Sequence, residues 1–292
     1  TLTKAKDADL KRENANIDAD TAMGTMLKYG SEGSKYFIDN YILPKDIAAA
    51  HINGDIHIHD KDFYMLTETC CQIDLTKLFH NGFSTGHGYL REPNDIRSYA
   101  ALACIAIQAN QNEMHGGQSV PNFDYSMAPG VAKTFRKQYF SQLAAFFSAA
   151  LGMDLKDAQL LAREIKKHLV GKITLSNIDD CRQQLIDFLP NHQAEGGFQA
   201  ISDAQAGQAH DFAAAAALDA ADKATYQAME AFIHNLNTMN SRAGAQVPFS
   251  SINYGTDTSL EARMVMKNLL RATMAGLGNG ETPIFPIQIF KV

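Results

Sequence analysis

The spacing of apolar and polar residues predicts a chain built mainly of helices, with a few short strands between them. Apolar side chains recur every three or four positions over residues 94–112, at Ile96, Tyr99, Ala103 and Ile107. This period is typical of a helix with one buried face. Asn94 or Asp95 can cap its amino terminus, and the helix is expected to end before the glycines that follow His115.

The same spacing and its capping signals predict further helices along the chain. We expect two short helices within 14–43 and longer ones over about 129–152, 154–169, 176–189, 211–240 and 258–276. Pro129 suits a first helical turn. Ser176 with Asp179, and Thr258 with Glu261, resemble capping boxes. The polar, glycine-containing segment 191–210 is expected to be an exposed connection.

Alternating polar and apolar residues predict strands. Ile56 and Ile58 alternate with Asp55, His57 and His59, a period of two that predicts a strand with a polar face. The segments QVPFSSINYG and PIFPIQIFKV also read as strands. Strands followed by long helices, with polar positions on the strands, favour an α/β barrel whose strands carry the chemistry.

Charge and composition exclude several classes of protein. The 292 residues include 46% hydrophobic residues, and the net charge is -6 without any Lys/Arg run, so a nucleic-acid or membrane-surface footprint is not expected. No stretch approaches the roughly 20 apolar residues of a membrane span, and no signal peptide opens the chain, which favours a cytoplasmic protein. The first residue is not Met and the end resembles a strand interior, so both ends look cut.

Adjacent cysteines in ETCCQIDL, residues 68–75, are the most unusual local feature. A disulfide between Cys70 and Cys71 is disfavoured, because neighbouring Cα atoms lie about 3.8 Å apart, below the usual disulfide range. On a regular strand the two side chains face opposite sides. Burial of one cysteine in the core and a zinc site with His57 and His59 both remain open, although no recognised zinc spacing is present.

Other candidate functional features can also be explained by a purely structural role. Cys104 and Cys181 are expected to be packed inside helices. The turn expected at His115-Gly116-Gly117-Gln118, and GTDTS at 255–259, could approach a phosphate or simply end or begin a helix. GLGNGE at 276–281 follows a helix, so it is not a dinucleotide fingerprint.

Six blocks of the chain together resemble the catalytic core of the anaerobic ribonucleoside-triphosphate reductases, which are glycyl-radical enzymes. They are NANIDADTAMGTMLKYGSE, NGDIHIHDKDF, CCQIDL, MHGGQSVPNFDYSMAPGV, NSRAGAQVPFSSINYGTDTS and AGLGNGETPIFPIQIF. The resemblance runs in order over residues 14–292. It implies part of a ten-stranded α/β barrel of the glycyl-radical enzyme type, preceded by a connector at residues 1–13.

The resemblance also implies a chemistry and its partners. A radical-SAM activase would create a glycyl radical in a homodimeric enzyme, and the radical would pass to a cysteine on a loop in the barrel. The resulting thiyl radical would take the 3′ hydrogen of a ribonucleoside triphosphate. The 2′ hydroxyl would leave as water, with formate as the expected reductant, although a thiol system is not excluded.

Carried onto this chain, the resemblance assigns roles to four residues near the cysteine pair. Cys70 would give its proton to the departing 2′ hydroxyl, and Cys71 would pack. His57 would be the pocket histidine that hydrogen-bonds substrate or formate. His59 and Thr69 would contact substrate. A neutral thiol, with an ordinary pKa of about 8.5, suits both proton donation and one-electron reduction.

Nucleotide regulation is implied as well. Helices within about 94–150 would form the dimer interface, where a deoxynucleoside triphosphate effector chooses the substrate. Gln108 and Lys137 would contact the effector's base and phosphate. The family's amino-terminal cone, which binds ATP or dATP, is missing from this sequence. So are its radical cysteine, its four-cysteine zinc cluster and its glycyl-radical loop, so the sequence reads as a fragment.

Two other functions remain open from the sequence. A formate-lyase-like acyltransferase of the same barrel type also uses neighbouring cysteines, but on a central loop rather than a strand. A non-catalytic nucleotide-binding module could dimerise through the helix at 94–112.

Overall fold

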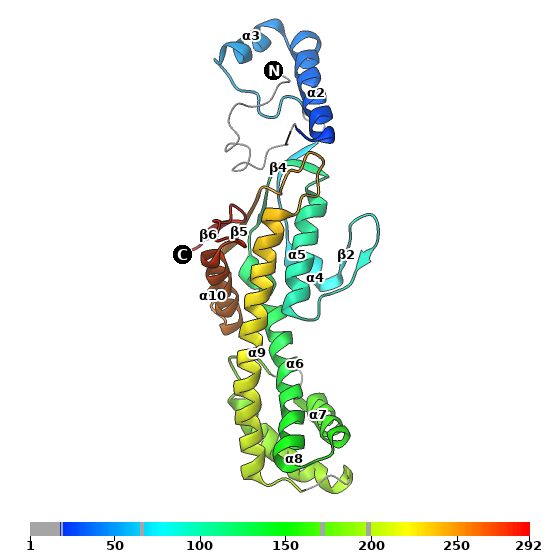
Figure 1. Cartoon of the computed structure of the whole chain (residues 1–292), viewed down its shortest axis with the longest axis vertical. Helices are drawn as coiled ribbons and strands as arrows, with labels where there is room; N and C mark the ends of the chain where they lie inside the picture. Colours follow the sequence, from blue (N-terminus) through cyan, green and yellow to red (C-terminus); the bar gives the residue numbers. More distant parts are fainter. Residues whose placement is uncertain (1–17, 19, 65–66, 170–172, 197–199) are drawn as a thin grey trace.

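The computed structural model describes residues 18, 20–64, 67–169, 173–196 and 200–292. Their elements, in order, are α2 (Ala22–Phe37), the π-helix η1 (Ile38–Ile42), α3 (Lys45–Asn53), β1 (Glu68–Gln72), α4 (Leu75–Asn81), β2 (Phe83–Ser84), β3 (Tyr89–Leu90), α5 (Ile96–Asn110), β4 (Met114–Val120), α6 (Phe123–Leu151), α7 (Leu155–Leu169), α8 (Asp180–Gly196), α9 (Asp203–Thr238), β5 (Ser250–Tyr254), α10 (Leu260–Ala275) and β6 (Ile287–Phe290). The molecule is elongated, with α2 and α3 at one end, the sheet near the middle and α7 and α8 at the other end (Figure 1).

The sheet has four parallel strands in the order β1-β4-β5-β6. Parallel strands need long crossovers, and α5, α6, α9 and α10 lie in the connections between them. The short strands β2 and β3 form a separate antiparallel pair. The described residues therefore form an α/β fold, and the ten-stranded barrel expected from the resemblance is not shown by them.

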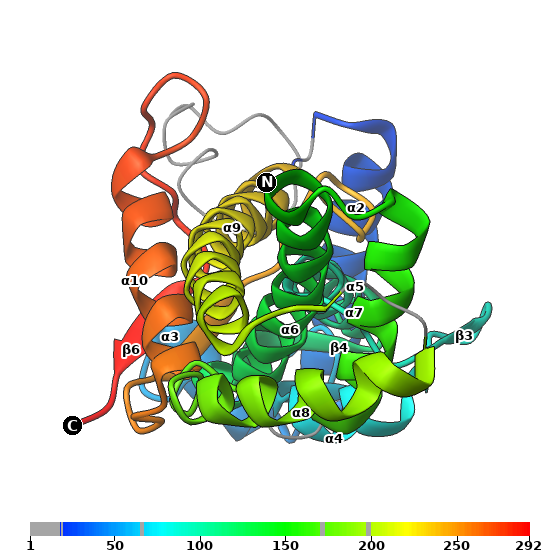
Figure 2. The same ribbon diagram turned by 90° about the horizontal axis from the view of Figure 1, so that it is seen from below.

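Two long helices form the body of the molecule. The 29-residue α6 packs along the 36-residue α9, which also contacts α5, α8 and α10. Figure 2 looks along these two helices. Their facing sides bury Phe123, Phe135 and Phe147 of α6 and Phe232 of α9 almost completely. Long helices of this kind are stabilised mainly by such packing of their apolar faces.

Tertiary packing also moved two predicted helix starts. Helix α6 begins at Phe123, so Pro129 lies inside the helix rather than at its first turn. Pro129 cannot donate a backbone hydrogen bond within the helix. The burial of Phe123 and Met127, which are fully buried, outweighs this loss. Helix α9 begins within the segment 191–210 that was expected to be an exposed connection. Ser202 caps it in a box with Gln205.

Several local predictions were wrong. Residues 55–59 form turns instead of a strand, and His115-Gly116-Gly117-Gln118 forms most of β4 instead of a turn. Residues 22–42 form α2 and a π-turn in one continuous run, where two short helices were expected. Helix α8 begins at Asp180, not Ser176, because the Asn177 side chain accepts from Thr174 in a preceding turn.

Other predictions are confirmed. Asp95 caps α5 in a reciprocal box with Ser98, and the four residues predicted to face the core are buried. Helix α7 and strands β5 and β6 lie where the pattern predicted them. Helix α10 begins one residue later than predicted, with Ser259 rather than Thr258 as its cap.

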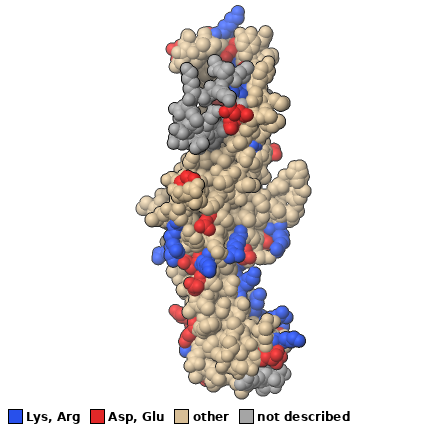
Figure 3. Space-filling model, viewed as in Figure 1, with Lys and Arg blue, Asp and Glu red and all other residues tan. Residues whose placement is uncertain are grey.

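The surface carries charge of both signs. Figure 3 shows Lys and Arg interspersed with Asp and Glu over the middle and lower parts of the visible face. No helix among the described residues combines the length and apolar character needed to cross a bilayer.

Candidate functional site

The adjacent cysteines lie on β1, where this strand pairs with β4. Cys70 has a positive φ of 44°, and the register between the strands shifts between Thr69 and Cys71. The extra residue lies on β4, where Gly116 and Gly117 stand opposite Cys70 alone, and such a β-bulge interrupts the regular alternation of side chains. The expectation that the two cysteines lie on a regular strand is therefore wrong at Cys70. The two cysteines nevertheless have different surroundings, since Cys70 is exposed and Cys71 is half-buried.

Gly116 of β4 makes room for the Cys70 thiol. A Cβ atom at this position would lie 2.9 Å from Cys70 Sγ and 3.2 Å from Thr69 Oγ1. Gly116 also has a φ of 89°, a conformation that favours glycine. The HGGQ segment thus serves the close approach of two strands, rather than a phosphate or a helix end.

Cys71 is held from the opposite strand and from α5. Asn110 Nδ2 lies 2.8 Å from Cys71 Sγ and 2.8 Å from Gln118 Oε1. Burial raises the pKa of the Cys71 thiol, and the neighbouring Cys70 and Glu68 add to this, while the Asn110 hydrogen bond opposes it. Cys71 also packs against the hydrophobic core. A neutral, packed thiol is a poor nucleophile.

The three histidines that precede β1 lie close together. The His51 and His57 rings are 5.7 Å apart, and those of His57 and His59 are 6.1 Å apart. His57 and His59 are exposed, and His59 Nδ1 lies 2.6 Å from Asp60 Oδ2. The backbone N–H of Ile58 donates to His51 Nδ1 over 3.2 Å. The turn thus groups His57 with His59 without a strand.

His115 is a site residue that the sequence pattern did not identify. It lies on β4, opposite Thr69 in register, and only 7% of it is exposed. Its Nδ1 lies 2.7 Å from Thr67 Oγ1, its Nε2 lies 3.4 Å from Asp60 Oδ2, and Phe63 stacks on its ring. The contacts join positions about 50 residues apart, so no local spacing signals them.

Thr69 is exposed beside the bulge. Its Oγ1 lies 3.8 Å from Cys70 Sγ, within reach of a weak hydrogen bond to sulfur. This places a hydroxyl and a thiol side by side on the open edge of β1.

Gln108 and Lys137 are not brought together within one chain. Gln108 donates to Asn235 Oδ1 over 2.6 Å near the end of α5. Lys137 lies near Asp95 at the other end of α5. Burial acts to raise the pKa of the Asp95 carboxyl, but hydrogen bonds from Ser98 and the charge of Lys137 outweigh it, so the pKa is lowered. Thirteen residues of helix separate the two ends by about 20 Å.

The remaining candidate phosphate site is GTDTS at 255–259, where a carboxylate of the protein already accepts hydrogen bonds from the backbone. The Asp124 carboxylate accepts from the backbone N–H groups of Gly255 at 2.8 Å and Asp257 at 3.0 Å. This supports the interpretation of GTDTS as the start of a helix rather than a phosphate site. Cys104 and Cys181 are buried, as predicted.

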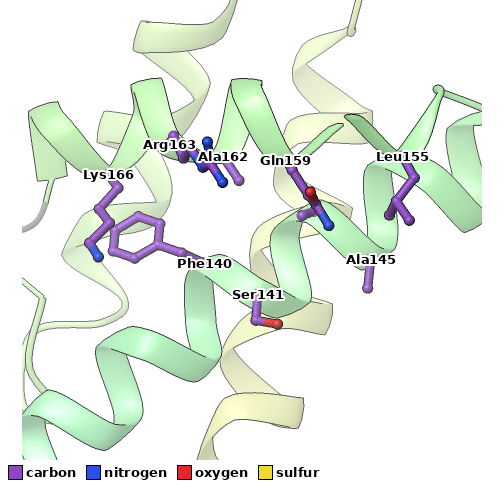
Figure 4. Close-up of a pocket in the computed structure, with 9 residues that line it drawn as sticks. Phe140, Ser141, Ala145, Leu155, Gln159, Ala162, Arg163 and Lys166 are labelled. Atoms are coloured by element: carbon purple, nitrogen blue, oxygen red, sulfur yellow. The ribbon is translucent and has the colours of Figure 1, made fainter. Parts of the chain in front are cut away.

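A surface groove of about 360 Å³ lies between α6 and α7, away from the cysteine pair (Figure 4). Its residues are Phe140, Ser141, Ala144, Ala145, Leu155, Gln159, Ala162, Arg163 and Lys166. None of the predicted site residues is among them. Lys137 lies one helical turn before Ser141 on α6.

Metal binding gains no support from the geometry. Over the residues that the structure describes, no three His, Cys, Asp or Glu side chains gather in a way that could hold a metal ion. The zinc alternative with His57, His59 and a cysteine therefore has no arrangement to carry it.

Comparison with known proteins agrees with the resemblance. The model of the anaerobic ribonucleoside-triphosphate reductase family matches residues 13–292. The chain is 24% identical over 294 residues to the anaerobic ribonucleoside-triphosphate reductase of Escherichia coli K12, covering 100% of this chain and 32% of that protein. It is 26% identical over 287 residues to the enzyme of the same name from Enterobacteria phage T4, covering 97% of this chain and 37% of that protein.

The chain thus spans about a third of the length of the curated relatives it matches. The match nevertheless extends over nearly all of its own residues, including the cysteine pair, the histidine turn and the sheet. The chain belongs to the anaerobic ribonucleoside-triphosphate reductase family.

Proposed function

We propose that this chain takes part in the anaerobic reduction of ribonucleoside triphosphates to deoxyribonucleoside triphosphates, with Cys70 as a working thiol. The observation that carries the proposal is the contrast between the two cysteines. Cys70 stands exposed opposite the glycines of a bulge in β4, while Cys71 is half-buried, packed and held by Asn110. Only the first thiol can meet a substrate without rearrangement of the core.

In the proposed reaction, Cys70 protonates the 2′ oxygen as the bond between that oxygen and the sugar carbon breaks, so that water leaves. His57 orients the substrate or formate from the neighbouring turn, with His59 and Thr69 as further contacts. A glycyl radical supplies the hydrogen-atom chemistry, and formate is the proposed reductant. The radical-SAM activase and a second copy of the chain are the proposed partners.

Effector binding would involve Gln108 and Lys137. Because Gln108 and Lys137 lie at opposite ends of α5, one nucleotide cannot easily touch both within one chain. A shared effector would have to lie between two copies, with Gln108 from one and Lys137 from the other. This arrangement is consistent with an interface that includes α5 and α6.

The acyltransferase alternative and the regulatory-module alternative predict different outcomes. An acyltransferase would need both thiols at a reacting carbon, which the burial of Cys71 disfavours. A regulatory module would need neither thiol.

The test replaces each cysteine in the full-length protein. We expect Cys70→Ala to abolish reduction of ribonucleoside triphosphates, because the leaving hydroxyl loses its proton donor. Cys71→Ala should retain most of the activity and lose stability instead, by about 1 kcal/mol for a small packed side chain. Product formation and chemical denaturation measure the two effects. Equal loss of activity in both variants would contradict the assignment, and activity independent of both would favour the regulatory module.

Binding provides a second measurement. Calorimetry with ribonucleoside and deoxyribonucleoside triphosphates should detect both classes in the wild-type protein. Failure to bind either class would remove the support for a reductase.

A further inference from the structure

His115 is a buried polar residue of the site, and the proposed chemistry does not use it. Nδ1 makes a hydrogen bond with Thr67 Oγ1 over 2.7 Å. Nε2 lies 3.4 Å from Asp60 Oδ2, a buried carboxylate oxygen without a hydrogen-bond partner among the described residues, so this contact is a close approach of a ring nitrogen and a carboxylate. The Phe63 ring covers one face at a centroid distance of 4.3 Å and an interplanar angle of 4°. The imidazole is therefore fixed in position and orientation.

Asp60 connects this fixed ring to the histidine turn. The same carboxylate oxygen, Oδ2, lies 2.6 Å from His59 Nδ1 and 3.4 Å from His115 Nε2. Asp60 itself has a φ of 47°, which costs free energy for a residue other than glycine. Residues 54–64 contain no strand and consist of turns, a bend and irregular backbone. Side-chain contacts, rather than a strand ladder, must hold this turn in place.

A continuous series of contacts runs from the proposed pocket histidine to the proposed thiol. The His57 ring lies near the ring of His59. Asp60 Oδ2 in turn lies within 4 Å of a ring nitrogen of both His59 and His115. Next to His115, Gly116 faces the Cys70 sulfur. His115 belongs to the strand that pairs with the strand of Cys70, so it links the turn to the sheet.

We propose that Asp60 and His115 are positioning residues, which hold the turn carrying His57 against β1 and β4 beside Cys70. The proposal rests on the proposed reductase function for its kinetic consequence, but its structural part does not. Positioning errors of about 1 Å can cost about two orders of magnitude in rate. The contact between Asp60 and His115, called the pin below, can therefore have a large effect on the rate without touching the substrate.

The kinetic test uses Asp60→Asn, His115→Gln and the double variant in the full-length enzyme. Asp55→Asn is the matched control: it removes an exposed carboxylate from the same turn, one without a side-chain partner among the described residues. We expect each single change to lower kcat roughly 10- to 100-fold with KM within about threefold. The double variant should be no worse than the worse single variant, because both changes break one contact.

A second measurement needs no turnover. Hydrogen exchange of the Ile58 and Phe63 amides, which donate to His51 Nδ1 and to the Asp60 carbonyl, reports whether the turn stays docked. Asp60→Asn should accelerate this exchange at least tenfold relative to Asp55→Asn, while exchange within α5 stays unchanged. Should His115→Gln fail to fold, Asp60→Asn alone decides the result.

The outcomes separate the two proposals. A wild-type protein that reduces no ribonucleotide overturns the proposed function, while accelerated exchange in Asp60→Asn still supports the pin. Exchange equal to that of Asp55→Asn overturns the pin. An active Asp60→Asn enzyme whose kcat lies within about twofold of the control overturns the positioning role in catalysis, even when exchange is faster.

Discussion

Single residues decide how the cysteine pair can act. Cys70 has a positive φ and lies opposite a bulge in β4, where Gly116 leaves the space that the Cys70 sulfur fills. Cys71, one residue later, meets Asn110 and the core. The residue types at 70 and 71 are identical, so their different surroundings come wholly from backbone geometry and from neighbours on β4 and α5.

A substitution at Gly116 tests this account. Gly116→Ala should destabilise the protein by roughly 2 to 4 kcal/mol, since it adds strain at positive φ and a Cβ against Cys70. Gly86→Ala is the control, because Gly86 has a similar φ of 91° but nothing within 4 Å of the added Cβ. It should cost only about 1 kcal/mol. Chemical denaturation measures both, and iodoacetamide labelling should show altered Cys70 reactivity only in Gly116→Ala. Equal costs would show that the contact with Cys70 carries no energy.

At the scale of elements, α5 joins the site to the helical body. It contributes Asn110 to the Cys71 contact and packs against both α6 and α9. Its start depends on the box formed by Asp95 and Ser98. The sequence could predict this helix well, because its capping residue and apolar period are both local signals.

The cap gives a prediction with a defined pH dependence. Asp95→Ala should lower the free energy of unfolding by about 1 kcal/mol, whereas Asp95→Asn keeps an acceptor and should cost less. Although burial opposes it, hydrogen bonds from Ser98 and the charges of Lys137 and Arg97 lower the pKa of Asp95 below 3.8. The unfolded chain therefore takes up the proton first. The advantage of wild type over Asp95→Asn should be present above pH 3.8 and vanish as pH falls below it. Denaturation curves between pH 2.5 and 6 measure this difference, and a constant difference would contradict it.

At the scale of the whole molecule, a buried polar pair joins α6 and α9. Tyr139 Oη lies 2.9 Å from His210 Nδ1, and both residues are at most 2% exposed. Burial lowers the pKa of His210 and Arg182 adds to this, while Asp211 and Asp179 oppose it. The segment that contains His210 was expected to be an exposed connection, so this pair was not foreseen.

The pair makes the stability of the body depend on pH. The folded state keeps His210 neutral, whereas the unfolded chain takes up a proton near pH 6.5. Stability should therefore be full above pH 6.5 and fall as pH drops toward the lower folded pKa. His210→Gln retains a polar partner for Tyr139 and should lack this contribution. Comparing their unfolding free energies at pH 7.5 and 5.5 checks the prediction; parallel losses in both proteins would refute it.

What the sequence determined by itself are the features whose causes lie within a few residues. These include the cap and apolar face of α5, the range of α7, the strands β5 and β6, and the order of motifs that carries the family resemblance. Only the tertiary structure decided the early starts of α6 and α9, the turn at 55–59, the bulge opposite Cys70 and the place of His115. Each of these depends on contacts between residues far apart in sequence, such as Thr67 with His115 or Tyr139 with His210. Burial against a distant partner outweighs local preference there, because a local pattern holds no information about which distant surface the chain will meet.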